Sequence, residues 1–439
     1  MMNVLYLHTH DTGRFIQPYD PAMSTPNLMK LAKDGTLFRN AYCCGPTCSP
    51  SRAALLTGEP PHMNGMYGLA HRGFELNDYS KHLANYLKQF GYETVLCGLQ
   101  HECKTAYGIG YDKVYVNPRD EREDLTSWDL SNGDAAIRYI REKHEKPFFL
   151  SYGLIHTHRP YQELDTDVLP DYLKVPHCLP DHSKIRTDFA RFVTSVKRAD
   201  MCIGRVLDAL EQEGLTDDTV IIYTTDHGIA FPFMKCNLYD TGIGVSLIIK
   251  YKTNPSKGRV CDSLVSHVDI YPTLCELLNI PKPRWLTGTS LMPLLNNEVE
   301  EVNEAIYSEI NYHAAAEPQR CVRTKRYKYI KRYGEWEGYV PSNIDGGDSK
   351  SYILSGGLLE HKPEREMLFD LILDSAEGNN VIDDLSYRKI AEYMRQKLKS
   401  HMVQTNDFLL ENQLPHPEGI KVNRTECMEP DSKNPEDYE

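Results

Sequence analysis

Short apolar segments that end in polar residues recur along the chain. They cover residues 4–7, 93–97, 147–154 and 219–223. Such runs are typical of strands that are buried on both faces of a parallel sheet. Between them, residues 79–90, 134–142 and 183–213 have the periodicity of amphipathic helices. The alternation predicts an α/β fold with a large, mostly parallel sheet between helices.

Histidines and aspartates cluster where the predicted strands end. The strand at 4–7 runs into HTHDTG and the strand at 219–223 into TTDHG. In doubly wound sheets, ligands bind at this carboxyl edge. A carboxylate and an imidazole can converge there on one ion, so we predict Asp11, Asp226 and His227 as metal ligands. His10 is either a further ligand or a hydrogen-bond partner of one, because imidazole suits calcium less well than a carboxylate does.

The segment CCGPTCSPSRAALLTG, residues 43–58, predicts a short helix that begins at Cys48. Pro50 suits the first helical turn, Ser49 can cap it with its side-chain oxygen, and Gly58 tolerates a left-handed terminus. Free N–H groups at the helix start, with Arg52 one turn along, would form an anion site beside Cys48. Taken alone, a cysteine is more often a small buried hydrophobic residue, and the cysteine spacing here does not fit paired zinc ligands.

The run CxPSRxxLLTG resembles the signature of the type I sulfatases, formylglycine-dependent enzymes of the alkaline phosphatase superfamily. In that family this cysteine, here Cys48, is oxidised after translation to formylglycine, and the resemblance implies that residue 48 shares the metal ion with the acidic and imidazole ligands. Further matches follow in order from Asp11 to Leu371. The resemblance implies an alkaline phosphatase-like fold, hydrolysis of a sulfate ester or sulfamate, one divalent metal ion, and a formylglycine-generating maturation enzyme as a partner.

Other site residues are implied by the same resemblance. In GLQHE, His101 matches a histidine that contacts the formylglycine hydrate, but Leu99 stands where the family has a lysine, which removes one positive charge. In IHTHRPY, His158 resembles the histidine near the leaving-group oxygen, with His156 as the alternative. Lys235 falls where the family carries a basic residue directed at the sulfate.

The segment GIAFPFMKCNLYDTG, residues 228–242, is similar to the sulfamidases, or heparan N-sulfatases. The resemblance implies a small sulfated saccharide, such as N-sulfoglucosamine, as the substrate. One hydroxyl of the hydrated formylglycine would attack sulfur while His158 or Lys235 protonates the leaving group, and His101 would take a proton from the second hydroxyl. Calcium is the first choice of metal because the family usually uses it, and His227 leaves manganese or another transition ion open.

Two other function classes remain open. The pair Asp226-His227 is similar to the phosphonate monoesterases of the same superfamily, so a phosphonate monoester or phosphodiester hydrolase is the alternative. The absence of the family's lysine at the position of Leu99 also favours this hydrolase. A catalytically inactive binding protein is the third class, and the presence of nucleophile, metal residues and histidines disfavours it.

The pattern changes after about residue 312. Residues 321–323 and 326–330 predict a hairpin, residues 367–371 a strand and residues 385–402 a helix. These segments resemble the small C-terminal subdomain of sulfatases. We therefore expect a catalytic domain at 1–312 and a C-terminal α+β subdomain with a small antiparallel sheet at 313–439. Residues 305–310 are expected to be a late strand of the main sheet, residues 333–366 a loop, and the last twelve residues disordered.

Composition narrows the partners and the compartment. A net charge of −13 argues against nucleic acid, and no apolar run approaches the roughly 20 residues that span a bilayer. The 12 cysteines are scattered through a long chain, which favours reduced thiols over a disulfide framework. With no leader pattern ahead of the first strand, the sequence predicts a cytoplasmic protein. Homo-oligomerisation remains open.

Overall fold

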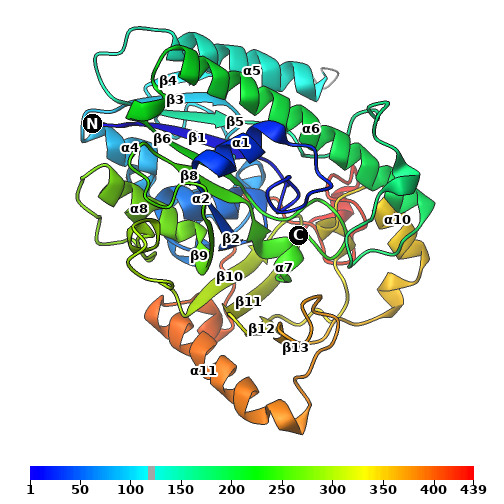
Figure 1. The fold of residues 1–439 in the computed structure, drawn as a ribbon. Coiled ribbons are helices and arrows are strands. Elements are labelled where there is room, and N and C mark those ends of the chain that lie inside the picture. The colour runs from blue at the N-terminus through cyan, green and yellow to red at the C-terminus, as the bar shows by residue number, and fades with distance from the viewer. Residues whose placement is uncertain (117–123) are drawn as a thin grey trace.

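Five adjacent parallel strands form one side of the larger of two sheets. The structure is a computed structural model that describes residues 1–116 and 124–439, and within these ranges the sheets have nine and four strands. The larger sheet has the order β4-β3-β5-β1-β6-β8-β2-β7, with β9 paired to β2 (Figure 1). Its strands are β1 (Asn3–Thr9), β2 (Thr36–Tyr42), β3 (Glu93–Gly98), β4 (Lys113–Tyr115), β5 (Phe148–Gly153), β6 (Thr219–Thr225), β7 (Gly244–Val245), β8 (Leu247–Lys250) and β9 (Val260–Ser266).

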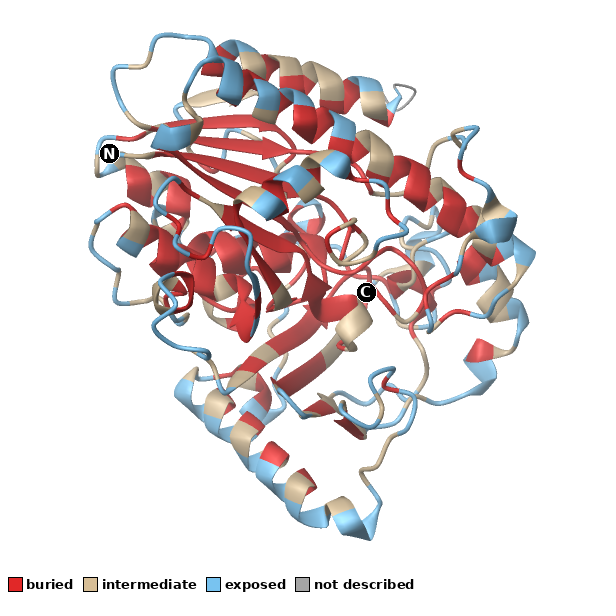
Figure 2. Ribbon diagram, viewed as in Figure 1, coloured by how far each residue is buried: buried red, intermediate tan, exposed pale blue. Residues whose placement is uncertain are grey.

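Strand β1 shows why the sheet is buried on both faces. All of its residues are buried, and Val4 and Tyr6 pack into one hydrophobic core while Leu5 and Leu7 pack into the other. The period of two along a strand sends alternate side chains to opposite faces. Figure 2 shows the central strands as buried almost throughout. The predicted α/β sandwich is confirmed, although β8 runs antiparallel to its neighbours β6 and β2.

Helices cover both faces of this sheet. On one face lie α1 (Pro26–Asp34), α5 (Leu125–Ile140) and α6 (Ser183–Gln212), and Figure 1 shows α5 and α6 side by side. On the other face lie α2 (Cys48–Thr57), α4 (Leu83–Lys88) and α8 (Ile270–Leu277). The remaining short helices of the described ranges are α3 (Pro61–Asn64), α7 (Asp240–Ile243), α9 (Met292–Leu295) and α10 (Asp348–Ser355).

The smaller sheet is antiparallel, with the order β10-β11-β12-β13. Its strands are β10 (Ala305–Tyr312), β11 (Ala316–Thr324), β12 (Tyr327–Arg332) and β13 (Glu366–Asp370), and α11 (Arg388–Gln404) packs against it (Figure 1). The expectation that 305–310 belongs to the main sheet is wrong. A short connection of three residues lets β10 pair with β11 as a hairpin, so the local partner takes the strand. The domain boundary at 312/313 stays a prediction.

Strand β10 also contacts the loop that precedes α2. The Ser308 hydroxyl donates a hydrogen bond to the Cys43 carbonyl at 2.6 Å, and the Glu309 N–H donates to the Cys44 carbonyl at 2.8 Å. These bonds join the small sheet to the segment that carries Cys48.

Two segments expected to be irregular have defined contacts. The predicted loop at 333–366 contains α10, which packs against α6 (Figure 1). At the C-terminus, the Arg424 N–H donates to the Asp437 carbonyl and the Glu439 N–H donates to the Val422 carbonyl, so the expectation of disorder is wrong there.

All 12 cysteines lie in the described ranges and are free. Among the helices described, none combines the length and apolar character needed to cross a bilayer.

Candidate active site

The predicted site residues converge at the carboxyl edge of the large sheet. His10 and Asp11 follow β1, and Asp226 and His227 follow β6, the strand paired directly with β1. His101 follows β3. Strand β5 lies between β3 and β1 in the sheet. This arrangement follows from the parallel order β3-β5-β1-β6, which places the four strand ends on one edge.

Helix α2 begins at Cys48, as predicted, and brings this residue to the same edge. The helix ends at Gly58, whose φ of +71° is left-handed and whose N–H donates to the Ala54 carbonyl. The predicted cap by Ser49 is wrong, because its hydroxyl instead accepts a hydrogen bond from the Ala70 N–H at 3.0 Å. Cys48 is only 3% exposed. Its sulfur lies within 4.8 Å of candidate ligand atoms of His10, Asp11 and Asp226.

The two aspartates form a buried pair. The Asp11 N–H donates to Asp226 Oδ1 at 2.8 Å, and the His227 N–H donates to the same oxygen at 3.0 Å. Burial alone would raise the pKa of Asp11, but the charge of the Lys235 ammonium and the hydrogen bond with His10 outweigh it and hold that pKa well below its usual value. Both carboxylates are therefore anionic and face one another across a small space.

Arg52 is directed at Asp226. Its Nη2 donates to Asp226 Oδ2 at 2.9 Å and to the Thr9 carbonyl at 3.0 Å, and the side chain is 1% exposed. The sequence placed Arg52 in an anion site beside Cys48. In the structure its guanidinium is instead already paired with a carboxylate of that site.

His227 fits a metal ion in this space. Its Nδ1–H donates to the Gly228 carbonyl at 2.9 Å, so Nε2 carries the lone pair. That Nε2 is buried without a hydrogen-bond partner among the described residues and lies 3.3 Å from Asp11 Oδ1 and 3.7 Å from Asp226 Oδ2. A lone pair facing two carboxylate oxygens is repulsive unless a cation lies among them. The donor set of two carboxylates and an imidazole therefore fits a divalent ion.

His10 lies between the carboxylates and His101. Burial lowers the pKa of His10 to about 4, so its ring is neutral at pH 7. Its Nδ1 is 2.8 Å from Asp11 Oδ1 and 3.2 Å from Asp226 Oδ2, and its Nε2 is 3.2 Å from His101 Nδ1. With Nδ1 protonated, His10 donates to Asp11 and accepts from His101. With the proton on Nε2, it donates to His101 and offers Nδ1 to an ion.

The two histidines after β5 point in different directions. His156 is fully buried, and its Nδ1 contacts Asp129 Oδ2 of helix α5 at 2.5 Å. His158 is half-buried, its ring centroid is 4.5 Å from that of His10, and its Nδ1 donates to the Arg159 carbonyl. A ring nitrogen of His158 also lies within 4.8 Å of a ring nitrogen of His10 and of Cys48 Sγ. His158 thus faces the site, and His156 is held against the helix layer.

Lys235 is buried and paired twice. Its Nζ lies 3.1 Å from Asp11 Oδ2 and 3.2 Å from Asp345 Oδ2. The sequence missed Asp345, which lies in the segment assigned to a loop. No local signal marked it, because a single aspartate before two glycines is ordinary turn composition. Leu99, at the expected lysine position, packs with Leu125, Trp128 and Ile155 in a separate apolar cluster.

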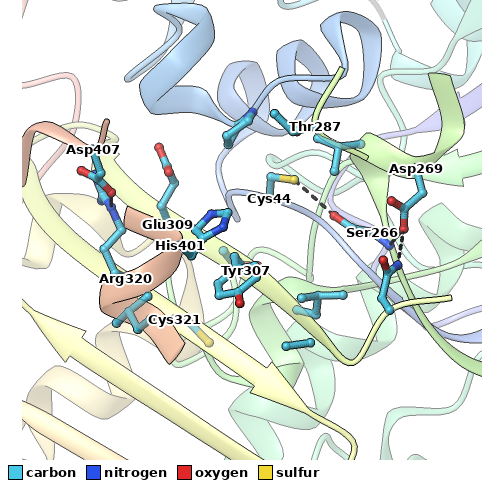
Figure 3. A pocket seen from close by; sticks show the side chains of 17 residues that line it. Cys44, Ser266, Asp269, Thr287, Tyr307, Glu309, Arg320, Cys321, His401 and Asp407 are labelled. Atoms are coloured by element: carbon cyan, nitrogen blue, oxygen red, sulfur yellow. Dashed lines mark hydrogen bonds and ion pairs between the residues drawn. The ribbon is translucent and has the colours of Figure 1, made fainter. Parts of the chain in front are cut away.

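A cavity of about 150 Å³ lies between the two sheets, and none of the predicted site residues lines it (Figure 3). Its polar groups pair with one another: Cys44 Sγ lies 3.3 Å from Ser266 Oγ, and Asp269 accepts hydrogen bonds from the Ser266 N–H and the Asn303 amide. Arg320 and Asp407 form an ion pair at its other end. These contacts connect the two sheets around the cavity, which is separate from the cluster around Cys48.

Two family models match the chain. The model described as Sulfatase covers residues 3–280, and the model described as N-sulphoglucosamine sulphohydrolase, C-terminal, covers residues 226–343. The first spans the residues from β1 through α8, including the whole cluster around Cys48 except Asp345.

Characterised relatives match along most of their length. Human N-sulphoglucosamine sulphohydrolase is 27% identical over 461 residues, with 92% of this chain and 90% of that protein covered. An ulvan-active sulfatase of Formosa agariphila is 29% identical over 402 residues, covering 89% of this chain and 77% of that one. Arylsulfatase K of Xenopus laevis is 24% identical, covering 90% and 82%.

Solved structures share the fold. A protein solved in complex with its substrate D-glucosamine-2-N,6-O-disulfate has a TM-score of 0.73 at 19% identity, covering 93% of this chain and 98% of that chain. A phosphonate monoester hydrolase of Agrobacterium radiobacter has a TM-score of 0.73 at 20% identity, covering 92% and 96%. The alkaline phosphatase-like architecture is therefore shown.

The relatives also correct the expected compartment. Human N-sulphoglucosamine sulphohydrolase and arylsulfatase K are lysosomal or secreted enzymes, so the prediction of a cytoplasmic protein is wrong. That prediction rested on the first residues of the sequence, which do not decide where a protein of this family works.

Proposed function

The chain belongs to the sulfatase family, and we propose that it removes sulfate from a sulfated sugar similar to N-sulfoglucosamine, through a formylglycine formed from Cys48. As a sulfuric ester hydrolase it needs a nucleophile, a way to neutralise the sulfate, and a proton donor for the leaving group. The observation that carries the proposal is the convergence of Cys48, two carboxylates and His10 within 4.8 Å at the sheet edge.

The environment of Cys48 supports its conversion. Burial raises the pKa of the thiol well above its usual value, and the opposing charge of Lys235 does not offset this. An unmodified Cys48 is therefore a neutral thiol at pH 7 and a weak nucleophile. Formylglycine would supply a hydrated aldehyde, one hydroxyl of which attacks sulfur while the other later expels the sulfate. A formylglycine-generating enzyme is the partner that this proposal requires.

A divalent ion would be held by Asp11, Asp226 and His227, with His10 and the modified residue 48 next to them. It would supply positive charge for the sulfate oxygens. The unpartnered Nε2 of His227 supports this donor set. Calcium is the first choice from the family, and the imidazole nitrogen makes manganese the alternative.

The remaining residues take the roles of positioning groups and proton carriers. Arg52 orients Asp226 through its hydrogen bond at 2.9 Å. His158 donates its Nδ1–H to the Arg159 carbonyl, so as an imidazolium it would present the Nε2–H to the departing oxygen or nitrogen, and Lys235 is the second candidate donor. His101, through His10, is placed to accept a proton from the nucleophile side.

The names of the relatives support the proposed substrate class. The C-terminal family model and the human relative both carry the name of an N-sulphoglucosamine sulphohydrolase. The decisive assay compares hydrolysis of N-sulfoglucosamine, an aryl sulfate and an aryl phosphonate by protein produced with a maturation enzyme. We expect sulfate release from the first two, loss of turnover in Cys48→Ala, and a peptide mass showing formylglycine at residue 48. Full activity with an intact thiol would refute the proposed nucleophile.

A second candidate, a phosphonate monoester or phosphodiester hydrolase, is favoured by two local features. The metal-facing pair Asp226-His227 and the apolar setting of Leu99 depart from the sulfatase pattern in the direction of the phosphonate monoesterases. Faster turnover of the aryl phosphonate than of either sulfated compound in the same assay would select this function.

A further inference from the structure

We propose that Asp345 is a specificity-determining residue, whose carboxylate accepts a hydrogen bond from a hydroxyl or amino group beside the sulfate and rejects substrates with a second anionic group there. This inference rests on the proposed function. It concerns which substituent of the substrate the site accepts next to the sulfate.

Asp345 is the outermost of three carboxylates around the cluster. Its side chain is 15% exposed, whereas those of Asp11 and Asp226 are 0% exposed. The Lys235 ammonium lies between Asp345 and Asp11, at 3.2 Å and 3.1 Å. One ammonium group therefore separates Asp345 from the reacting centre, and this sets the carboxylate beside the position proposed for the sulfate.

The carboxylate has unused acceptor capacity. Within the described part of the chain, Lys235 is the one ion-pair or hydrogen-bond partner of this carboxylate, with its Nζ 3.4 Å from Oδ1 and 3.2 Å from Oδ2. A carboxylate can accept about four hydrogen bonds. His313, buried and close enough for Lys235 and Asp345 to act on its pKa, likewise has an Nδ1 without a partner among the described residues. Unsatisfied polar groups at the edge of an anion site fit a polar ligand rather than a packed core.

The backbone around Asp345 is fixed on both sides. Before it, Asn343 accepts from the N–H groups of Ala314 and Ala315, each at 3.0 Å. After it, Gly347 lies against the Arg159 guanidinium so closely that an added Cβ would be 2.4 Å from Nη1. Arg159 directly follows His158 in sequence and forms two hydrogen bonds of 2.8 Å with Asp188. The carboxylate is therefore held in place before a ligand arrives, as specificity requires.

The charge of Asp345 determines which neighbours it tolerates. A cationic or neutral hydrogen-bond donor gains from the carboxylate, and a second sulfate or carboxylate on the ligand meets a like charge at short range. Lys235 cannot offset this repulsion fully, because it is shared between Asp345 and Asp11. The proposed preference is a monosulfated unit with a hydroxyl or amine beside the sulfate.

The test measures binding, so that it does not depend on turnover. Three aryl sulfonates that differ in one ring substituent, aminomethyl, hydroxymethyl or carboxylate, are titrated by calorimetry into the metal-loaded protein. We expect the carboxylate compound to bind about 10-fold more weakly than the other two, because of the like charge of Asp345. In Asp345→Asn the difference should shrink to within about 3-fold, since the shape is kept and the charge is lost.

The matched control is Asp348→Asn, the same charge change three residues along. Asp348 pairs with Arg191 at the surface, and we expect this variant to keep the 10-fold difference. A difference unchanged in Asp345→Asn would show that Asp345 only holds Lys235, and would overturn the inference, as would the absence of a difference in the parent protein. Should Asp345→Asn not fold, raising the salt from about 0.05 to 0.5 M on the parent protein must compress the difference instead. Charge-dependent binding without sulfate release would refute the proposed function and leave the inference standing.

Discussion

Replacing Arg52 by methionine tests whether the site is a buried, charge-paired cluster. Arg52 is 1% exposed and donates to Asp226 Oδ2 at 2.9 Å and to the Thr9 carbonyl at 3.0 Å. In Arg52→Met, Oδ2 loses its ion pair, although Oδ1 keeps the N–H groups of Asp11 and His227. Removing one partner of a buried pair costs about 3–5 kcal/mol, because the other charge stays buried without compensation.

The expected shift in melting temperature follows from the chain length. An unfolding entropy of about 2.1 cal/mol/K per residue, over the 439 residues, gives roughly 0.9 kcal/mol/K. The loss then corresponds to about 3–5 °C, measured by differential scanning calorimetry without added metal. Arg191→Met is the control, because that arginine and its partner Asp348 have side chains 36% and 51% exposed, and such a pair contributes about 0–1 kcal/mol. A fall in Tm for Arg52→Met no larger than for the control would refute the buried pairing.

Three further outcomes are expected. Removing divalent ions with a chelator should lower Tm by about 3 °C relative to protein with the ion at 100 times its Kd, a free energy of about 2.7 kcal/mol, and metal analysis should find one ion per chain; an unchanged Tm contradicts the metal site. Burial lowers the pKa of His82 to about 3, so the unfolded chain alone takes up the proton as pH falls below 6.5, and stability should drop by about 2 kcal/mol between pH 7.5 and pH 5. His82→Asn, which keeps an acceptor for the Ala84 N–H, should remove that part of the pH dependence, as chemical denaturation at both pH values will show; an identical pH dependence contradicts it. His158→Asn should lower kcat by about 100-fold or more with little change in Tm, whereas His156→Asn should cost about 1–3 kcal/mol of stability by removing the buried side-chain hydrogen bond to Asp129 Oδ2; the reverse pattern would exchange the two roles.

Much of the fold was predictable because its signals are local. Each buried strand of the central sheet is an apolar run, and the clusters HTHDTG and TTDHG stand where such runs end. The parallel order then brings Asp11 and Asp226 together without further information. The placement of Cys48 at the first residue of α2 follows in the same way from the proline and glycine around it.

The parts that could not be predicted depend on distant partners. The pattern of β10 fits either sheet, and only the pairing with β11 decides between them. The sequence cannot separate His156 from His158, two residues apart, until Asp129 of helix α5 is seen to take His156. Asp345 lies 110 residues from Lys235, in a segment with ordinary turn composition, so no local pattern predicts their contact.

The bonds from β10 to the loop before α2 have a consequence for the order of events during synthesis. Ser308 and Glu309 tie down the carbonyls of Cys43 and Cys44, and Cys48 is enclosed in the finished molecule. These two strand residues leave the ribosome some 260 positions after the thiol does. For the conversion proposed above, we therefore expect the modifying enzyme to act on Cys48 before this late strand docks, because the docked strand helps to enclose the thiol.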